Sequence, residues 1–319
     1  MDYGLVTEAM SGYDIPESEA ILLRHNENMT FRVGTDYLLQ IHEPVQGFET
    51  QHLYEGLDRM AVYETEIRFL GHLKNQGMMS REPVKNRRGQ WITKLDNGNV
   101  AMVSRWIEGE SLDKMTLCEE HYYRIGLLAA ELHRCAKGFR GFPAISYDGR
   151  HVERIGEKLR ALEGNGLDCA SCRALERACD AVGTALRKAE GEFQMLHADL
   201  SLSNILQTKA GLAAIDFSLF GMGHPMLDIA VLFGNIGGLA CRQKIAEGYR
   251  DGGGRFDYEA LDACFVLTIL DCIAIHFGQW CRESWFEDRM KRWREESLEP
   301  FARGERLLAD DFCIIHAGN

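Results

Sequence analysis

Residues 193–234 read FQMLHADLSLSNILQTKAGLAAIDFSLFGMGHPMLDIAVLFG, and they form the most informative segment of the chain. Within them, residues 205–215 consist of two short apolar segments joined by a turn, which predicts a pair of strands. Asp199 and Asn204 precede this pair, and Asp216 follows its second strand. We expect the strand pair to bring these three polar side chains around one small volume.

Those side chains offer carboxylate and carboxamide oxygens, which suit Mg2+ and do not suit zinc or copper. Phosphoryl transfer needs little more than such a set. One carboxylate orients the attacking hydroxyl and accepts its proton, while a second carboxylate and an amide oxygen hold the metal that neutralises the phosphates. The pattern therefore favours a phosphotransferase that uses Mg2+.

The motif HxDxxxxN, followed by an apolar strand and an Asp-Phe pair, resembles the loops of a known superfamily. It comprises aminoglycoside phosphotransferases, choline kinases and type II homoserine kinases, which are relatives of protein kinases. The resemblance implies that Asp199 is the catalytic residue and that Asn204 and Asp216 bind the metal. It also implies that His197 supports the loop by hydrogen bonding and that Asp228, in the segment GHPMLDIA, braces the loop backbone.

The rest of the chain fits the same resemblance. Residues 1–105 show alternating apolar segments around one helical segment, and residues 106–319 are mostly helical in pattern. We expect an α+β, bilobal protein-kinase-like fold. Residues 1–105 would form a small N-terminal nucleotide-binding lobe with an antiparallel sheet and one helix. Residues 106–319 would form a larger lobe that carries catalysis and substrate binding.

The resemblance further implies that ATP lies between the lobes. Asn28 matches a residue of the loop that covers the phosphates, and Glu66 matches a glutamate of the helix in the first lobe. Ser104 and Trp106 lie in the segment that resembles the hinge, where backbone groups meet adenine. Gln40 occupies the place on the third strand that faces the α- and β-phosphates.

Gln40 departs from the family, which has a lysine or arginine there. Glutamine brings no charge and cannot form an ion pair with Glu66, so Arg24 and Arg32 are candidates to supply the missing cation. The departure leaves open a pseudokinase or nucleotide-sensing scaffold. A protein Ser/Thr kinase is the other alternative. It is disfavoured by Ser201, which stands where protein kinases carry a lysine, and by the lack of an evident activation segment after Asp216.

The acceptor side is less specific in sequence. Asp271 lies in the apolar segment VLTILDCIAIHFGQW, and a buried carboxylate needs a partner or a function. With Trp280 and Glu283 nearby in sequence, it is a candidate for the substrate wall. Aminoglycosides, amino alcohols, homoserine-like molecules and sugars all remain open as hydroxyl substrates.

The composition narrows the partners. The net charge of −12 argues against nucleic acid, because phosphate backbones need a basic surface, and it is compatible with a cationic substrate. The sequence shows no signal-peptide pattern and no apolar run of the roughly 18 residues that a membrane span needs. We therefore expect a cytoplasmic protein with a small-molecule substrate, and neither nucleic acid nor a membrane as a partner.

Overall fold

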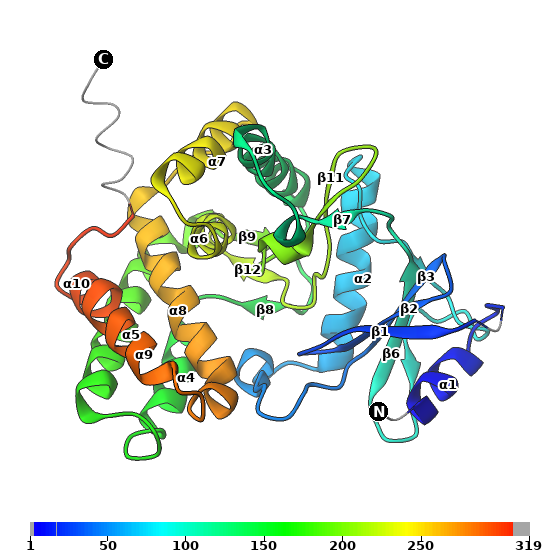
Figure 1. Ribbon diagram of the computed structural model, residues 1–319, viewed down its shortest axis with the longest axis horizontal. Coiled ribbons are helices and arrows are strands. Elements are labelled where there is room, and N and C mark those ends of the chain that lie inside the picture. The colour runs from blue at the N-terminus through cyan, green and yellow to red at the C-terminus, as the bar shows by residue number, and fades with distance from the viewer. Residues whose placement is uncertain (1–2, 17, 309–319) are drawn as a thin grey trace.

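The computed structural model describes residues 3–16 and 18–308, which fold into two lobes (Figure 1). The first lobe contains an antiparallel sheet whose strands follow the spatial order β1, β2, β3, β6 and β4, while β5 also pairs with β6. These strands are β1 (Ala20–His25), β2 (Met29–Val33), β3 (Tyr37–Ile41), β4 (Pro83–Val84), β5 (Thr93–Lys94) and β6 (Val100–Arg105). The predicted α+β, two-lobed architecture is confirmed.

The two faces of this sheet have different partners, because successive strand residues point to opposite sides. Leu39 and Val103 pack with Val6 of helix α1 (Tyr3–Ser11). Met102 faces the other side, where it packs with helix α2 (Arg59–Asn75). The lobe therefore holds a second helix, α1, beyond the one expected. The apolar residues of α1 cover a sheet face that would otherwise be exposed to water.

Helices dominate the second lobe, and two small three-stranded sheets lie among them. Its helices are α3 (Glu119–Ala136), α4 (Gly149–Arg160), α5 (Cys169–Ala189), α6 (Met226–Asn235), α7 (Leu239–Asp251), α8 (Tyr258–Trp280), α9 (Phe286–Trp293) and α10 (Glu299–Ala302). One sheet has the strand order β11, β10, β7 and the other β8, β12, β9. Their strands are β7 (Glu110–Ser111), β8 (Ile145–Ser146), β9 (Gln194–Leu196), β10 (Ile205–Gln207), β11 (Leu212–Ala214) and β12 (Gly221–Gly223).

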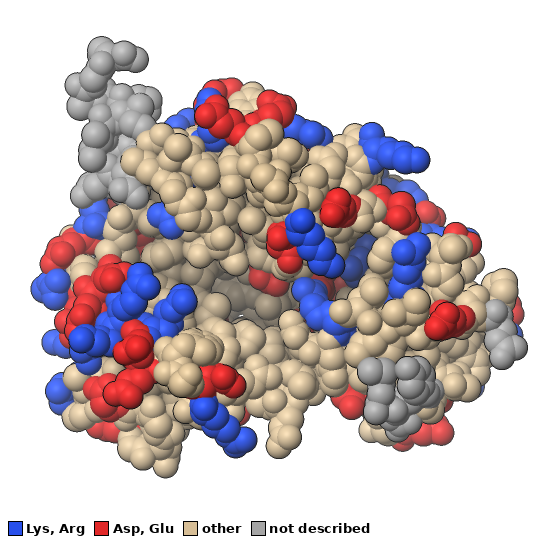
Figure 2. Space-filling model, in the orientation of Figure 1, with Lys and Arg blue, Asp and Glu red and all other residues tan. Residues whose placement is uncertain are grey.

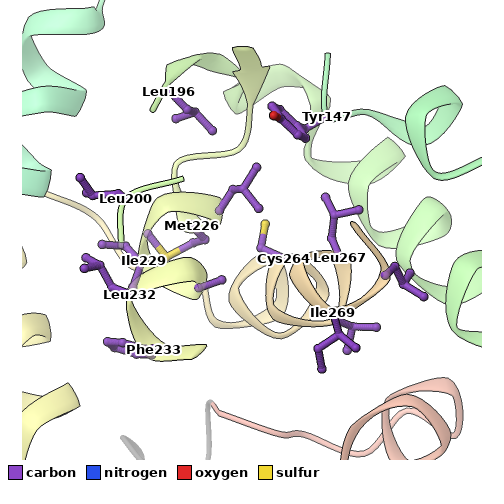
Figure 3. Packing of buried hydrophobic residues seen from close by; sticks show 14 of the residues in the cluster. Tyr147, Leu196, Leu200, Met226, Ile229, Leu232, Phe233, Cys264, Leu267 and Ile269 are labelled. Carbon is purple, nitrogen blue, oxygen red and sulfur yellow. The ribbon is translucent and has the colours of Figure 1, made fainter. Parts of the chain in front are cut away.

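Helix α8 forms the centre of this lobe. Its length and apolar composition would suit a membrane span, but 72% of its most apolar window is buried inside the molecule. Met226 and Ile229 of α6 belong to the same buried cluster as Cys264 and Leu267 of α8 (Figure 3). The burial identifies α8 as a core helix, as its sequence indicates.

The segment between β3 and α2 links the two lobes by packing. The Glu49 N–H donates to the Ile275 carbonyl of α8 at 2.9 Å, and Arg154 of α4 donates to the His52 carbonyl at 3.0 Å. Phe48 is buried in the large core of the second lobe. This segment therefore forms part of the wall between the lobes.

Candidate active site

The loop between β9 and β10 carries the predicted catalytic motif, and His197 fixes its shape. His197 is fully buried, its Nε2 lies 2.9 Å from the Ile215 carbonyl, and its Nδ1 accepts the Asp199 N–H at 3.3 Å. Since Nδ1 accepts, the ring proton resides on Nε2 and donates to the carbonyl. Both nitrogens are thereby committed to the loop backbone, and the ring has no free position for proton transfer.

Asp228, near the start of α6, also fixes this loop by accepting hydrogen bonds from its backbone. Its two oxygens accept the N–H groups of His197 at 3.2 Å and Ala198 at 2.7 Å, and one also lies 2.9 Å from His133 Nε2. Ala198 has φ of 64°, a left-handed conformation that costs energy for a residue with a Cβ. The charge-assisted hydrogen bonds from a fully buried carboxylate offset that strain.

The strand pair β10–β11 brings Asp199, Asn204 and Asp216 together. Asn204 Nδ2 donates to Asp199 Oδ2 at 2.7 Å and to the Asp199 carbonyl at 2.9 Å, so its Oδ1 is left for another partner. That partner is Arg24 of β1, whose Nη1 lies 3.4 Å from Asn204 Oδ1 and whose Nη2 donates to Asp216 Oδ2. Asn204 and Asp216 therefore share one cationic group, and Asn204 links Asp199 to it.

This arrangement fits a divalent metal. The oxygens of Asn204 and Asp216 already hold a guanidinium cation, and amide and carboxylate oxygens are the ligands that Mg2+ prefers. Ser218 Oγ donates to the other Asp216 oxygen at 3.0 Å and fixes the carboxylate orientation. Asp216 itself has φ of 64°, so its backbone is held in a strained conformation at the place where the metal would bind.

Asp199 lines a cavity whose walls come from both lobes. Burial raises the pKa of Asp199, while the nearby His197 and Arg24 side chains and the Asn204 hydrogen bond act to lower it. A carboxylate with a raised pKa is a better proton acceptor than one held strongly acidic. The environment of Asp199 therefore suits the role of general base.

Glu27, in the turn between β1 and β2, is a second carboxylate at this site that the sequence did not single out. Glu27 Oε2 lies 2.8 Å from Ser218 Oγ, and the Tyr54 hydroxyl donates to Oε1 at 3.3 Å. Burial, aided by the negative charge of Asp199, raises the pKa of Glu27 to about 7. Only the fold reveals this residue, because its partner Ser218 lies 191 positions away.

The raised pKa predicts a pH dependence of stability. Between about pH 4.5 and 7 the folded protein retains a proton on Glu27 that the unfolded chain has lost, so the free energy of unfolding falls as pH rises through this window. From the lower to the higher pH of this window, the free energy of unfolding of wild type should fall by about 1–2 kcal/mol more than that of Glu27→Gln. The figure is smaller than full burial would give, because the carboxylate borders the cavity. Urea unfolding at pH 5 and pH 8 measures it. Exposed Glu64→Gln is the control, and an equal pH dependence in Glu27→Gln and wild type would contradict the assignment.

The cavity beside Asp199 has a volume of about 360 Å³ and extends from the β1–β2 turn to helices α8 and α9. A hollow in the middle of the molecule has mostly uncharged walls (Figure 2). Its far end is lined by Asp271 and by the rings of Phe265, Trp280 and Trp293. The size is in the range of pockets for small molecules.

Two histidines hold Asp271 in place. His151 Nε2 lies 2.8 Å from Asp271 Oδ1, and His52 Nε2 lies 3.9 Å from the same oxygen. Burial acts to raise the pKa of Asp271, but the hydrogen bond from His151 and the two nearby imidazoles outweigh it and lower the pKa to about 2. Asp271 is therefore ionised near neutral pH, on the wall of the cavity that α8 supplies.

Other predicted residues are distributed as follows. Asn28 lines the cavity, and its buried Oδ1 has no hydrogen-bond partner among the residues the structure describes. Ser104, on β6, is buried and its Oγ is likewise unpartnered. The Trp106 ring lies under the Arg32 guanidinium, 4.5 Å from it. Glu283 is exposed in the turn after α8 and is not among the cavity-lining residues, so its predicted place in the substrate wall is not met.

The cation beside Gln40 is neither of the two arginines, Arg24 and Arg32, that the sequence suggested. Gln40 is buried on β3, and Arg81 Nη1 donates to its Oε1 at 3.0 Å. Arg24 contacts the side-chain oxygens of Asn204 and Asp216 and Arg32 covers Trp106, so the arginine beside Gln40 is Arg81, in the loop before β4. No sequence motif distinguishes Arg81.

Comparison with solved structures shows that this fold recurs. The chain aligns with a microcompartment-associated aminopropanol kinase at a TM-score of 0.73 and 19% identity, covering 97% of this chain and 100% of the other. It aligns with an amicoumacin kinase in complex with AMP-PNP, Ca2+ and Ami at a TM-score of 0.70 and 16% identity, covering 94% of each chain. A spectinomycin phosphotransferase in complex with ADP and spectinomycin gives a TM-score of 0.63 at 13% identity, with 97% and 98% coverage.

Sequence comparison assigns the family. A search of curated proteins finds no significant match. Residues 20–264, which include parts of both lobes and the loops that carry Asp199, Asn204 and Asp216, match the phosphotransferase enzyme family. The protein-kinase-like fold and the phosphotransferase class predicted from the sequence are confirmed, and the chain belongs to the phosphotransferase enzyme family.

Proposed function

We propose that this enzyme transfers the γ-phosphate of ATP to the hydroxyl group of a small amine-bearing alcohol. The observation that carries the proposal is the position of Asp199. It borders a cavity on one side, and on the other side it is hydrogen-bonded to Asn204. Asn204 and Asp216 both contact the guanidinium of Arg24. A proton acceptor, a metal-binding pair and room for an acceptor molecule thus meet at one place.

The residues divide the work of phosphoryl transfer. Asn204 and Asp216 would hold Mg2+, which neutralises charge on the phosphates. Asp199 orients the acceptor hydroxyl and takes its proton. His197 and Asp228 keep the loop backbone in the strained conformation that presents Asp199 to the cavity. Nucleotide binding is supported by the complexes of the similar kinases with AMP-PNP and with ADP.

The acceptor end favours a single amine. Among the described residues of α6, α8 and α9 that line the cavity, Asp271 is the one acidic side chain. The aromatic rings of Trp280 and Phe265 lie on the same wall, and an ammonium group gains from both a carboxylate and nearby aromatic faces. Arg289, the basic residue at this end, lies 5.8 Å from the Trp293 ring. A compact amino alcohol fits this wall better than a substrate with several amines.

Measurement of ADP release with a panel of alcohols tests the proposal. The panel contains small amino alcohols, neutral diols of matched size and aminoglycosides, each with Mg2+ and ATP. We expect the amino alcohols to have kcat/KM at least about 10-fold above the diols, the value of one charge-assisted hydrogen bond. Nucleotide binding without ADP release from any alcohol would instead support the pseudokinase alternative.

Replacing Asp271 tests the amine site directly. Asp271→Asn keeps the side-chain shape and removes the charge, so we expect KM for an amino alcohol to rise about 10- to 100-fold with a smaller change in kcat. A neutral diol is the matched control, and its KM should change little because it has no ammonium group. An equal rise for both substrates would show that Asp271 shapes the cavity and does not select amines.

A further inference from the structure

The first lobe contains a buried charge cluster that the proposed reaction has not yet used. Gln40 of β3 is 5% exposed, Glu66 of α2 is 4% exposed and Arg81 is 8% exposed. Together with Ser104 and Phe217 they line a small cavity of about 20 Å³, the space of about one water molecule. Gln40 pairs in register with Thr30 of β2, which lines the main cavity. The cluster therefore lies beside the place where nucleotide phosphates would enter.

The negative charge of Glu66 partly balances the positive charge of Arg81 in this cluster. Burial lowers the pKa of Arg81 to about 10, and the negative charge of Glu66 acts against that effect. Burial raises the pKa of Glu66 to about 7, and the positive charge of Arg81 acts in the opposite direction. Desolvating both groups is costly, so an arginine in this position needs acceptors for its donors.

The guanidinium has donors to spare. Of its five N–H groups, one is accepted by Gln40, and no second hydrogen bond from Arg81 is found to any residue the structure describes. The positive charge of Arg24 also acts on Arg81 and lowers its pKa. Two arginines thus repel each other at the edge of the metal-binding pair, and an anion with several oxygens would relieve that repulsion.

We propose that Arg81 binds the phosphates of the nucleotide, with Gln40 as its positioning residue. The positive charge that the family places on the third strand is supplied here from the loop before β4. Gln40 accepts one N–H and aims the guanidinium, while Glu66 balances its charge. The inference rests on the proposed ATP-dependent function, and it explains how a neutral residue at position 40 is compatible with nucleotide binding.

Binding of Mg2+–AMP-PNP, measured by calorimetry, tests the assignment independently of turnover. We expect Arg81→Met to weaken binding about 10- to 100-fold, as for a lost charge-assisted contact, and Arg81→Lys to weaken it less. The decisive variant is Gln40→Lys combined with Arg81→Met, which returns the cation to β3 and should recover most of the lost affinity. Arg87→Met, an exposed arginine paired with Asp14, is the control and should bind as wild type does.

A second set of measurements distinguishes loss of nucleotide binding from loss of the fold. Arg81→Met leaves Glu66 without its balancing charge, so Arg81→Met with Glu66→Gln is measured alongside it, and thermal unfolding without nucleotide reports on the fold of each. Wild-type affinity in a folded Arg81→Met protein, or no recovery in the Gln40→Lys double variant, would overturn the role of Arg81 alone. If wild type itself binds no Mg2+–nucleotide, the proposed function and this inference are both overturned.

Discussion

Asp199→Asn is expected to lower kcat by about 1,000-fold, within the range for loss of a general base. The substitution keeps an oxygen that can accept the Asn204 Nδ2 hydrogen bond, so the loop should hold its shape. What it removes is the group that takes the proton from the acceptor hydroxyl. Since the Asn204 and Asp216 oxygens remain, affinity for Mg2+–AMP-PNP should stay within a few-fold of wild type.

The pH profile distinguishes a proton acceptor from a residue that only shapes the site. Because burial raises the pKa of Asp199, wild-type activity should fall as the pH drops through that raised pKa and the carboxylate takes up a proton. The residual activity of Asp199→Asn should lose this acidic limb. A variant that retains activity within about 10-fold of wild type, with the same limb, would remove Asp199 from the role.

The residues predicted from sequence share a property, which is proximity along the chain. Asp199, Asn204 and Asp216 flank a single strand pair, so their convergence follows from local structure. Asp228 lies on the next helix and reaches the loop backbone directly. Within such a short segment the spacing of residues along the chain largely determines their distances in space. A sequence motif can therefore locate the centre of the site.

The residues that sequence analysis missed act across long separations. Arg81 meets Gln40 from 41 positions away, and His151 meets Asp271 from 120 positions away. Glu27 acquires its raised pKa through burial where the first lobe meets the second, beside Ser218. A charge acquires a function in these cases through burial and pairing, and neither can be derived from one sequence without the packing of the lobes.

Helix α1 shows the same limitation in the fold. The first residues have a weak helical pattern, and their place is decided by the sheet face that they cover with Val6 and Ala9. Glu283 shows the converse. It lies near Trp280 in sequence, but α8 ends at Trp280 and the turn that follows directs Glu283 to solvent. Closeness along the chain predicts closeness in space within a helix or strand, but it does not do so across a turn.

Asp216→Asn is expected to abolish the stabilisation of the enzyme by Mg2+–ATP. A ligand at about 100 times its Kd adds about 2.7 kcal/mol to the free energy of unfolding, which should raise the wild-type Tm by about 5 °C or more. In the variant, one carboxylate ligand of the metal is lost while Ser218 can still hydrogen-bond to the amide. The metal-dependent part of the shift should therefore vanish, and wild type in EDTA should match the variant in Mg2+.

Arg24 makes this prediction specific, because its guanidinium contacts the same Asn204 and Asp216 oxygens that would bind the metal. Exposed Asp251→Asn is the control and should keep the full Mg2+–ATP shift. If Asp216→Asn also kept it, the metal would have to bind elsewhere, and the guanidinium between Asn204 and Asp216 would be a permanent ion pair. If Asp216→Asn lost the shift, Arg24 would be a cation that must give way to the metal. Binding of Mg2+ would then release a second arginine, near Arg81, at the place where the phosphates arrive.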